Sequence, residues 1–428
     1  GNVRARGPAG TTSYAQGEWW GEAALKADVQ DDRRITAVGP ATIFCISRDE
    51  FEARIGPLRK ISARPSVMMR AQDFAALRAE LGIPEAIGGS TLEQVAEEDE
   101  DAEEEDGAAS GGYRLADLEQ LAYLGAGAFG RVTLVKDKRS GGVFALKRQW
   151  KQQVVDMRQV TNVVNEKNLM RKLNHPFILR LVATFQDKDC LYLLLERVMG
   201  GELFSYLANT SGGIVSDAHA RFYAGCVLLA LEHMHDQNIL YRDLKPENIM
   251  IDEQGYCRII DFGFAKIVED RTYTICGTPE YLAPELVLGR GHHKGVDYWA
   301  VGVLIFEMLV GYSPFADRPG NDQMVVCKNI VEQRLVIPKV VGAKARDLIK
   351  KLLNRTVSSR LGCKRGGVAD IKSHKWFKGF DWAALEQKRQ DPPWVPPLKS
   401  ATDTQHFDED PGDEYMPFAD DGSGIFDG

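Results

Sequence analysis

Nine carboxylates fill the ten positions of residues 97–106, EEDEDAEEED, and this run limits how the chain can fold. Such a run repels itself and cannot bury apolar surface, so it is typical of an extended, disordered segment. A cluster rich in Gly, Ala and Ser follows at 107–112. We therefore expect a disordered acidic linker over 85–113, with a small unit at 1–84 and a large one after it.

The acidic run also accounts for the charge of the chain. Its nine carboxylates exceed the formal net charge of −8, so the rest of the chain is close to neutral. No broad basic field is left to attract nucleic acid or a membrane surface. No apolar run approaches the roughly 18 residues of a spanning helix. Seven cysteines are scattered singly without CxxC pairs, which argues against disulfides and zinc and for a reducing, cytoplasmic location.

The large unit begins with a glycine-rich stretch, LGAGAFGRV, at 124–132. Gly125, Gly127 and Gly130 fit GxGxxG, which occurs both in dinucleotide-binding turns and in hairpins over ATP phosphates. A dinucleotide-binding turn opens a helix, whereas RVTLVKD and GGVFALK alternate like two strands joined by a turn. The hairpin is therefore favoured, with Leu124 and Val132 at its two ends.

The second strand of this hairpin ends in FALK, which matches the pattern that places a lysine, here Lys147, against the α- and β-phosphates of ATP. A helical segment follows, VTNVVNEKNLMRKL, and it contains Glu166. A lysine held in a cleft needs an anion to orient its side chain. We expect Glu166 to be that partner.

Two further motifs predict phosphoryl transfer. They are LYRDLKPENIMI at 240–251 and IIDFGFAK at 259–266. Phosphoryl transfer needs a carboxylate near the attacking hydroxyl, a cation near the γ-phosphate and oxygen ligands for Mg²⁺. Asp243 suits the first role and Lys245 the second, while Asn248 and Asp261 supply the metal ligands.

The segment after these motifs contains VEDRTYTIC and then CGTPEYLAPE, which ends at an A-P-E motif. A phosphate on Thr274 would add up to about two negative charges that Arg242 can hold, so we expect Thr274 to be the activating phosphorylation site. Thr278 is expected close to Asp243, as part of the substrate site. Glu285 and Arg360 are expected to form a buried structural pair.

Residues 118–377 resemble the eukaryotic serine/threonine protein kinases, and YRDLKPEN, FGFAK, TICGTPEYLAPE and HKWFKGFDW resemble the branch with the cyclic-nucleotide-dependent kinases. SATDTQHFDEDPGDE, at 400–414, is similar to the C-terminal tail of cGMP-dependent kinases. The resemblance implies an α+β fold with a β-rich N-lobe and a helical C-lobe over 118–377, and a tail over 378–428 that wraps both lobes.

The same resemblance implies ligands and substrates. ATP and Mg²⁺ are the expected cofactors, with Glu196 and Val198 lining the adenine. Glu202, Glu247 and Glu307 match acidic positions that favour protein substrates with Arg or Lys before the target Ser or Thr. The alternative for these three glutamates is that they are ordinary surface charges.

The small unit contains GEWWGEAALKADVQDDRRITAV at 17–38, which resembles the phosphate-binding cassette of a cyclic-nucleotide-binding domain. The resemblance implies a partial β-barrel with helices over 1–84. Glu22, after Gly21, would accept from the ribose hydroxyl, Arg34 would bind the cyclic phosphate, and the N–H of Ala23 would face the same anion. The alternative is a small barrel in which Arg34 forms a surface ion pair.

Together these patterns predict a serine/threonine kinase regulated by a cyclic nucleotide, with cGMP favoured. A cAMP-responsive or nucleotide-independent kinase is the alternative within the same class. A pseudokinase scaffold is the alternative from another class, and it predicts the loss of Lys147, Asp243 or Asp261, all of which are present. The sequence leaves the oligomeric state open.

Overall fold

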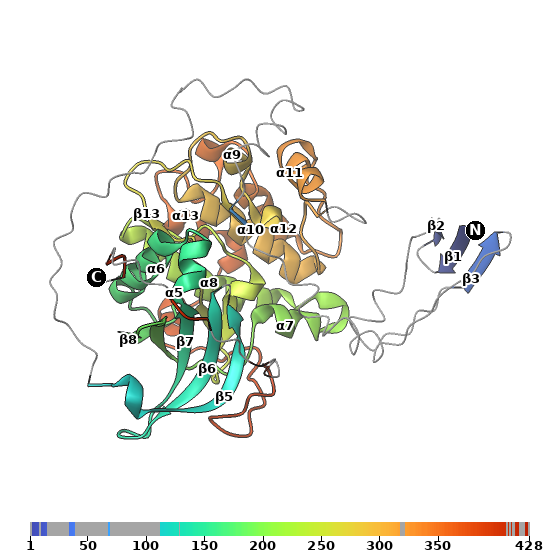
Figure 1. The fold of residues 1–428 in the computed structure, drawn as a ribbon. Coiled ribbons are helices and arrows are strands. Elements are labelled where there is room, and N and C mark those ends of the chain that lie inside the picture. The colour runs from blue at the N-terminus through green and yellow to red at the C-terminus, as the bar shows by residue number, and fades with distance from the viewer. Residues whose placement is uncertain are drawn as a thin grey trace.

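The computed structural model describes residues 2–7, 10–14, 34–38, 67–68, 112–127, 129–316, 322–407, 410, 412, 416–418 and 424–426. Within residues 112–407 the chain forms a strand-rich lobe and a larger helical lobe (Figure 1). This confirms the prediction of a β-rich N-lobe and a helical C-lobe. The acidic run at 97–106 lies outside the described residues, so the expected linker remains a prediction.

The N-lobe is one antiparallel sheet of five strands in the order β5-β6-β7-β9-β8. Val and Leu recur along these strands, and both faces of the sheet are covered: Leu134 is buried in the main core cluster, while Val135 and Leu194 are buried in a second cluster on the other face. Helices α5 and α6 follow β7 in the chain. The strands are β5 (Leu118–Gly127), β6 (Gly130–Asp137), β7 (Val143–Trp150), β8 (Leu181–Gln186) and β9 (Cys190–Glu196), and the helices are α5 (Lys151–Asp156) and α6 (Val160–Lys172).

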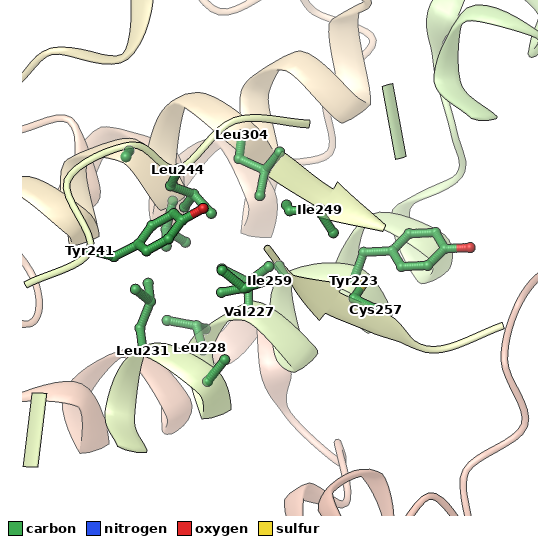
Figure 2. Packing of buried hydrophobic residues seen from close by; sticks show 14 of the residues in the cluster. Tyr223, Val227, Leu228, Leu231, Tyr241, Leu244, Ile249, Cys257, Ile259 and Leu304 are labelled. Carbon is green, nitrogen blue, oxygen red and sulfur yellow. The ribbon is translucent and has the colours of Figure 1, made fainter. Parts of the chain in front are cut away.

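The C-lobe is built around two long helices, α8 (Asp217–Asp236) and α10 (Gly295–Val310). Ser216 begins α8 by accepting a hydrogen bond from the His219 backbone N–H, and α10 ends at Gly311 in a left-handed conformation, φ 87°. Figure 2 shows residues of α8, among them Val227 and Leu231, packed against the loop and short strands that carry the 240–261 motifs. The motifs therefore rest on a rigid apolar base.

Shorter elements complete the C-lobe. Two small antiparallel pairs, β10 with β13 and β11 with β12, flank the catalytic motifs. The strands are β10 (Ile239–Leu240), β11 (Ile249–Ile251), β12 (Cys257–Ile259), β13 (Lys266–Ile267) and β14 (Cys276–Gly277). The helices are α7 (Leu203–Ala208), α9 (Pro284–Val287), α11 (Gln323–Glu332), α12 (Ala343–Leu352), α13 (Val368–Lys372) and α14 (Trp382–Glu386). Single 3₁₀ turns lie at 115–117, 211–213, 246–248, 279–281, 357–359 and 375–377.

The C-terminal tail contacts both lobes. Near its start, the Trp394 ring lies 4.7 Å from the Tyr206 ring on α7. At its end, Phe426 is buried against Val154 and Val163 of the N-lobe helices, and its carbonyl accepts a hydrogen bond from Gln186. Phe426 is thus held on the N-lobe by apolar packing and one hydrogen bond.

The N-terminal unit is described only in its strands. β1 (Asn2–Gly7), β2 (Gly10–Tyr14) and β3 (Arg34–Val38) form an antiparallel sheet in the order β2-β1-β3. The two-residue β4 (Val67–Met68) pairs with β14 of the C-lobe. Most of the expected partial barrel lies outside the described residues and remains a prediction.

Two other predictions concern the described part of the chain. Its six cysteines are all free, and five of them are buried. None of the helices described is both long enough and apolar enough to cross a membrane.

Candidate active site

The glycine-rich hairpin joins β5 and β6 at the edge of the N-lobe sheet. A side chain at Gly130 would place its Cβ 2.0 Å from the Arg148 carbonyl oxygen, so Gly130 allows β6 to approach β7. Gly125 and Gly127 face open space instead, with no atom within 4 Å of the same position. The third glycine therefore serves packing, while the first two leave room for a ligand close to the backbone.

Lys147 on β7 and Glu166 on α6 form the ion pair that the sequence predicts. The Lys147 Nζ lies 2.8 Å from Oε1 and 3.1 Å from Oε2 of Glu166. Burial lowers the pKa of Lys147, but the Glu166 and Asp261 carboxylates outweigh it, so the pKa is raised above its ordinary value. Lys147 is thus a fixed cation.

The helix that carries Glu166 is tied to the segment after Asp261. Asn165, next to Glu166, donates from its side-chain amide to the Ala265 carbonyl, 2.8 Å away. The sequence analysis did not identify this contact, which joins the two lobes at the cleft. A shift of α6 would therefore strain both the ion pair and this hydrogen bond.

Asp243 lies at the centre of the catalytic loop and is buried, with 3% of its surface exposed. Its Oδ1 accepts a hydrogen bond from the Thr278 hydroxyl at 2.9 Å, and its Oδ2 accepts one from the Asn248 amide at 2.7 Å. The Lys245 ammonium is 3.7 Å from Oδ2. The structure thus places three predicted site residues around the Asp243 carboxylate, and Thr278 lies beside it as expected.

Asp297 of α10 anchors the loop that carries Asp243. This carboxylate accepts from the backbone N–H groups of Tyr241 at 3.1 Å and Arg242 at 2.8 Å, and it also bonds His235 at 2.7 Å. Burial raises the pKa of Asp297, but these hydrogen bonds, led by that of His235, hold the pKa below its ordinary value. Arg242 has φ 68°, a left-handed conformation that the anchor stabilises.

Asp261 faces the cleft from the other side. It is exposed, has φ 60°, and accepts the Gly263 backbone N–H at 3.1 Å. The Asn248 amide nitrogen donates a hydrogen bond to Asp243, so the amide oxygen is available as a metal ligand. Mg²⁺ is bound by oxygen, with one or two protein ligands and the rest from phosphates and water. Asn248 and Asp261 fit such an ion.

The activation segment presents Thr274 at the surface, whereas Thr272 is buried and its backbone pairs with His292. The Arg242 guanidinium donates from Nε to the Phe264 carbonyl at 2.7 Å. Its Nη1 is buried and has no hydrogen-bond partner among the described residues. Arg242 therefore keeps a donor for a further acceptor, as a phosphate on this segment requires.

The predicted adenine contacts lie at the joint between the lobes. Leu124 and Val198 belong to the same core cluster, and Val132 packs against it. The Glu196 carboxylate accepts from the Arg180 backbone at 2.9 Å and lies 3.2 Å from the Arg258 guanidinium. Because the Glu196 carboxylate is bound to Arg180 and Arg258, we expect Glu196 to contact the adenine base through its backbone.

The three predicted substrate glutamates differ in environment. Glu202 is exposed, while Glu247 and Glu307 are each 8% exposed. Glu307 accepts a hydrogen bond from the Tyr281 hydroxyl at 2.6 Å. Buried carboxylates are not ordinary solvated charges, so that alternative does not hold for Glu247 and Glu307.

The predicted cyclic-nucleotide residues are located less fully. Gly21, Glu22 and Ala23 lie outside the described residues. Arg34 is the first residue of β3, where its backbone pairs with Arg6 of β1. Their roles remain predictions.

The anchoring role of Asp297 was not predicted from the sequence. A signal was present, because Asp297 is a charged residue within the apolar run GVDYWAVGVLIFEMLV, and a buried charge needs partners. Its partners could not be identified, since His235 and Tyr241 are distant in sequence.

Comparison with known proteins agrees with this geometry. Residues 118–377 match the protein kinase domain family. A cAMP-dependent protein kinase catalytic subunit of Dictyostelium discoideum is 45% identical over 69% of this chain and 45% of its own length. The human catalytic subunit PRKX is 44% identical over 71% of this chain and 83% of its own length.

A third relative extends into the N-terminal unit. The cGMP-dependent protein kinase isozyme 1 of Drosophila melanogaster is 39% identical over 95% of this chain and 51% of its own length. The chain therefore spans about half the length of the Dictyostelium and Drosophila relatives.

Proposed function

The chain belongs to the protein kinase family, in the branch of serine/threonine kinases with cAMP- and cGMP-dependent relatives, and we propose that it transfers the ATP γ-phosphoryl group to Ser or Thr of basic protein substrates. The observation that carries the proposal is the Asp243 network. A carboxylate held through both oxygens by Thr278 and Asn248 is fixed where an incoming hydroxyl would meet it.

Each residue contributes a defined step. Asp243 orients the substrate hydroxyl and accepts its proton, and Lys245, close to Asp243, neutralises charge on the transferred group. Lys147, fixed by Glu166, holds the α- and β-phosphates. Asn248 and Asp261 would hold Mg²⁺, which when bound neutralises phosphate charge and aligns the phosphates.

The preference for basic substrates rests on Glu202, Glu247 and Glu307. Two of these carboxylates are buried, and a buried carboxylate gains most from an arginine that supplies charge-assisted hydrogen bonds. We therefore expect Arg or Lys before the target residue. Peptides with those residues replaced by Ala should be phosphorylated more slowly.

The test of the chemistry is Asp243→Ala, assayed with a basic peptide. Without the positioned base we expect turnover to fall by about 10²–10⁴-fold, while the affinity for ATP stays within a few-fold. Glu253→Ala, at an exposed carboxylate paired with Arg197, is the matched control and should keep full turnover. Full turnover in Asp243→Ala would refute the assignment, and no turnover in the unaltered chain would favour the scaffold alternative.

Activation is assigned to phosphorylation of Thr274. The residue is exposed to a modifying kinase, and the buried Arg242 Nη1 offers a donor to the product. Mass spectrometry of active protein should find phosphate on Thr274. A fully active preparation without it would show that the segment is ordered by other means.

Regulation by a cyclic nucleotide, with cGMP favoured, is the finer part of the proposal. It is supported by the cassette at 17–38 and by the relative named cGMP-dependent, whose similarity extends over 95% of this chain. Relatives named cAMP-dependent also match, over 69% and 71% of this chain, and for that reason cAMP is kept as the alternative ligand. The cassette would relieve inhibition of the kinase on binding.

Arg34→Ala tests the cassette, with the neighbouring Arg33→Ala as its matched control. A lost charge-assisted contact costs about 1.5–3 kcal/mol, which corresponds to a roughly ten- to hundred-fold higher concentration of cGMP for half-maximal effect. Titrations with cGMP and cAMP are followed by calorimetry and by peptide phosphorylation. No response to either nucleotide would support the nucleotide-independent alternative.

A further inference from the structure

A second cavity, of about 590 Å³, opens beside the activation segment. It lies between α9, α11 and the 3₁₀ turn at 357–359, and α9 and α11 pack together at one end of the C-lobe (Figure 1). None of the described residues to which the proposed chemistry assigns a step lines it. Sites for small molecules have volumes of about 300–1,000 Å³, so the cavity is large enough for a ligand.

The walls of this cavity are largely aliphatic. Four such side chains line it, from α9 and the residue after it, from α11 and from the 3₁₀ turn: Pro284, Leu288, Val331 and Val357. Val357 is 40% exposed, and Leu288 and Val331 are partly exposed, so water meets this apolar surface. The described lining contains no Phe, Tyr or Trp on which a flat ring could stack. The walls therefore suit an aliphatic group, which leaves water when it binds.

Three arginines surround the same cavity: Arg271, Arg290 and Arg355. Arg271 and Arg290 are exposed, and their side chains form no ion pair or hydrogen bond with the described part of the chain. Arg355 donates to backbone carbonyls at the end of α11, among them that of Ile330 at 2.7 Å. Carbonyls leave its charge in place, so all three arginines contribute positive charge to the cavity.

This charge is not balanced from within the cavity. Glu285 is the one carboxylate among the described lining residues. Both of its oxygens are bonded to Arg360, at 2.6 and 2.8 Å. The cavity therefore has an excess of positive charge, which attracts an anion.

A buried nitrogen in the wall also lacks a partner. His292 lines the cavity and is 3% exposed, and its Nε2 has no hydrogen-bond partner among the described residues. A neutral histidine can carry its proton on Nε2 and donate it to an oxygen. A buried polar atom without a partner costs free energy, which a ligand oxygen would recover.

We propose that this cavity binds an aliphatic carboxylate of the fatty-acid class. The alkyl chain lies along Leu288, Val331 and Val357, and the carboxylate faces Arg271 and Arg290, since arginine binds a carboxylate through two parallel hydrogen bonds. A carboxylate is favoured over a phosphate, because a single charge costs less to bring into a largely apolar cavity. The proposal does not depend on the proposed kinase activity.

A ligand in this cavity would contact the activation segment. Thr272 and His292 exchange both of their backbone hydrogen bonds, at 3.1 and 2.9 Å, and Arg271 directly precedes Thr272. A carboxylate held by Arg271 would therefore fix the start of this segment against the C-lobe. We expect saturating decanoate to slow tryptic cleavage after Arg271 by at least about three-fold, as followed by mass spectrometry. An unchanged rate would overturn this placement of the carboxylate.

Calorimetry of the full chain with decanoate tests the site directly. We expect saturable binding of one decanoate per chain. Acetate keeps the carboxylate without the alkyl chain, and decanol keeps the chain without the charge, so each should bind at least about five-fold more weakly. Absence of saturable decanoate binding, or equal affinity for decanol, would overturn the proposal.

Two variants locate the ligand. Arg271→Ala combined with Arg290→Ala should weaken decanoate binding by about ten-fold, because each exposed charge contributes up to about five-fold. Val357→Trp fills the cavity without removing a charge and should also weaken binding. Arg334→Ala, at an exposed arginine outside the lining, is the matched control.

Undiminished decanoate binding in the double arginine variant would overturn the assignment of the site. Denaturant unfolding shows whether each variant is folded. If Val357→Trp does not fold, the double arginine variant still decides the question, because both of its changes are at exposed side chains.

Discussion

Two ion pairs, one in each lobe, differ in how far they are buried and in what they can bind. At the cleft, Lys147 pairs with Glu166 while 21% of the lysine side chain remains exposed. In the C-lobe, Arg360 is fully buried against Glu285, with bonds of 2.6 and 2.8 Å to its two oxygens. The arginine also donates to the carbonyls of Gly295 and Asn354.

The difference lies in what remains for other partners. Each guanidinium nitrogen of Arg360 is bonded, and its planar fork fits only one arrangement, so this pair fixes the C-lobe, as the sequence analysis predicted. Lys147 is a compact cation with three donors at the edge of open space, so it can hold Glu166 and a phosphate together. Burial with saturated bonding therefore marks a structural pair, and partial exposure marks a functional one.

Breaking the structural pair should have the largest effect. Arg360→Ala leaves Glu285 as an unpaired buried charge, and we expect the free energy of unfolding to fall by about 3–5 kcal/mol. Arg360→Lys keeps the charge but loses the fork and should fall between that variant and the unaltered chain. Denaturant unfolding measures both. A loss below about 1 kcal/mol in Arg360→Ala would show that the pair is dispensable.

The functional pair should respond in the opposite way. Lys147→Met keeps the length of the side chain and removes the charge, and we expect peptide phosphorylation to fall by at least about a hundred-fold. The variant also leaves Glu166 without its cation, but the lysine side chain is 21% exposed to water, so we expect a smaller loss in the free energy of unfolding than in Arg360→Ala. Lys136→Met, at an exposed lysine of β6, is the matched control. Equal losses of stability in Lys147→Met and Arg360→Ala would remove the distinction.

Buried groups of the C-lobe should also make its stability depend on pH. Burial, with the nearby charge of Arg242, lowers the pKa of His292 to about 3. In the unfolded chain the pKa returns to about 6.5, so between these values the unfolded state binds the extra proton and stability falls as the pH is lowered. At pH 5.5 this costs about 1.4 kcal/mol relative to pH 7.5.

Unfolding of His292→Gln at the two pH values tests this expectation. The difference between pH 5.5 and 7.5 should shrink by about 1.4 kcal/mol in this variant, because glutamine does not titrate. His219→Gln, at a partly exposed ring, should keep the full difference. An unchanged difference in His292→Gln would mean that the pKa of His292 is not lowered in the folded protein.

A surface pair should give the smallest effect and set the scale. Lys351 and Asp347 lie one turn apart on α12, 2.9 Å from each other, with side chains 49% and 33% exposed. Lys351→Ala should lower the free energy of unfolding by about 0.3–0.5 kcal/mol. Thermal and denaturant unfolding beside Arg360→Ala would measure it. A loss above about 2 kcal/mol would mean that the distance between the charges, more than their burial, determines how much such a pair contributes to the free energy of unfolding.

The sequence by itself indicated most of the candidate chemistry, and its resemblance to protein kinases implied the two-lobed architecture. Alternating strands, the spacing of Asp243, Lys245 and Asn248, and the glycine-rich stretch are local features, and each places its side chains through a few adjacent residues. The Lys147–Glu166 and Glu285–Arg360 pairs also followed from sequence, because a cation held in a cleft and a charge in an apolar lobe both need a counter-charge. For these residues the structure added distances and exposure.

Only the tertiary structure decided the contacts between distant segments. Asp297 anchors the catalytic loop, Asn165 ties α6 to Ala265, and Phe426 packs against Val163 of α6. The physical reason is that the partner of a buried polar group depends on how segments far apart in the sequence pack against each other. The spacing of neighbouring residues does not specify that packing.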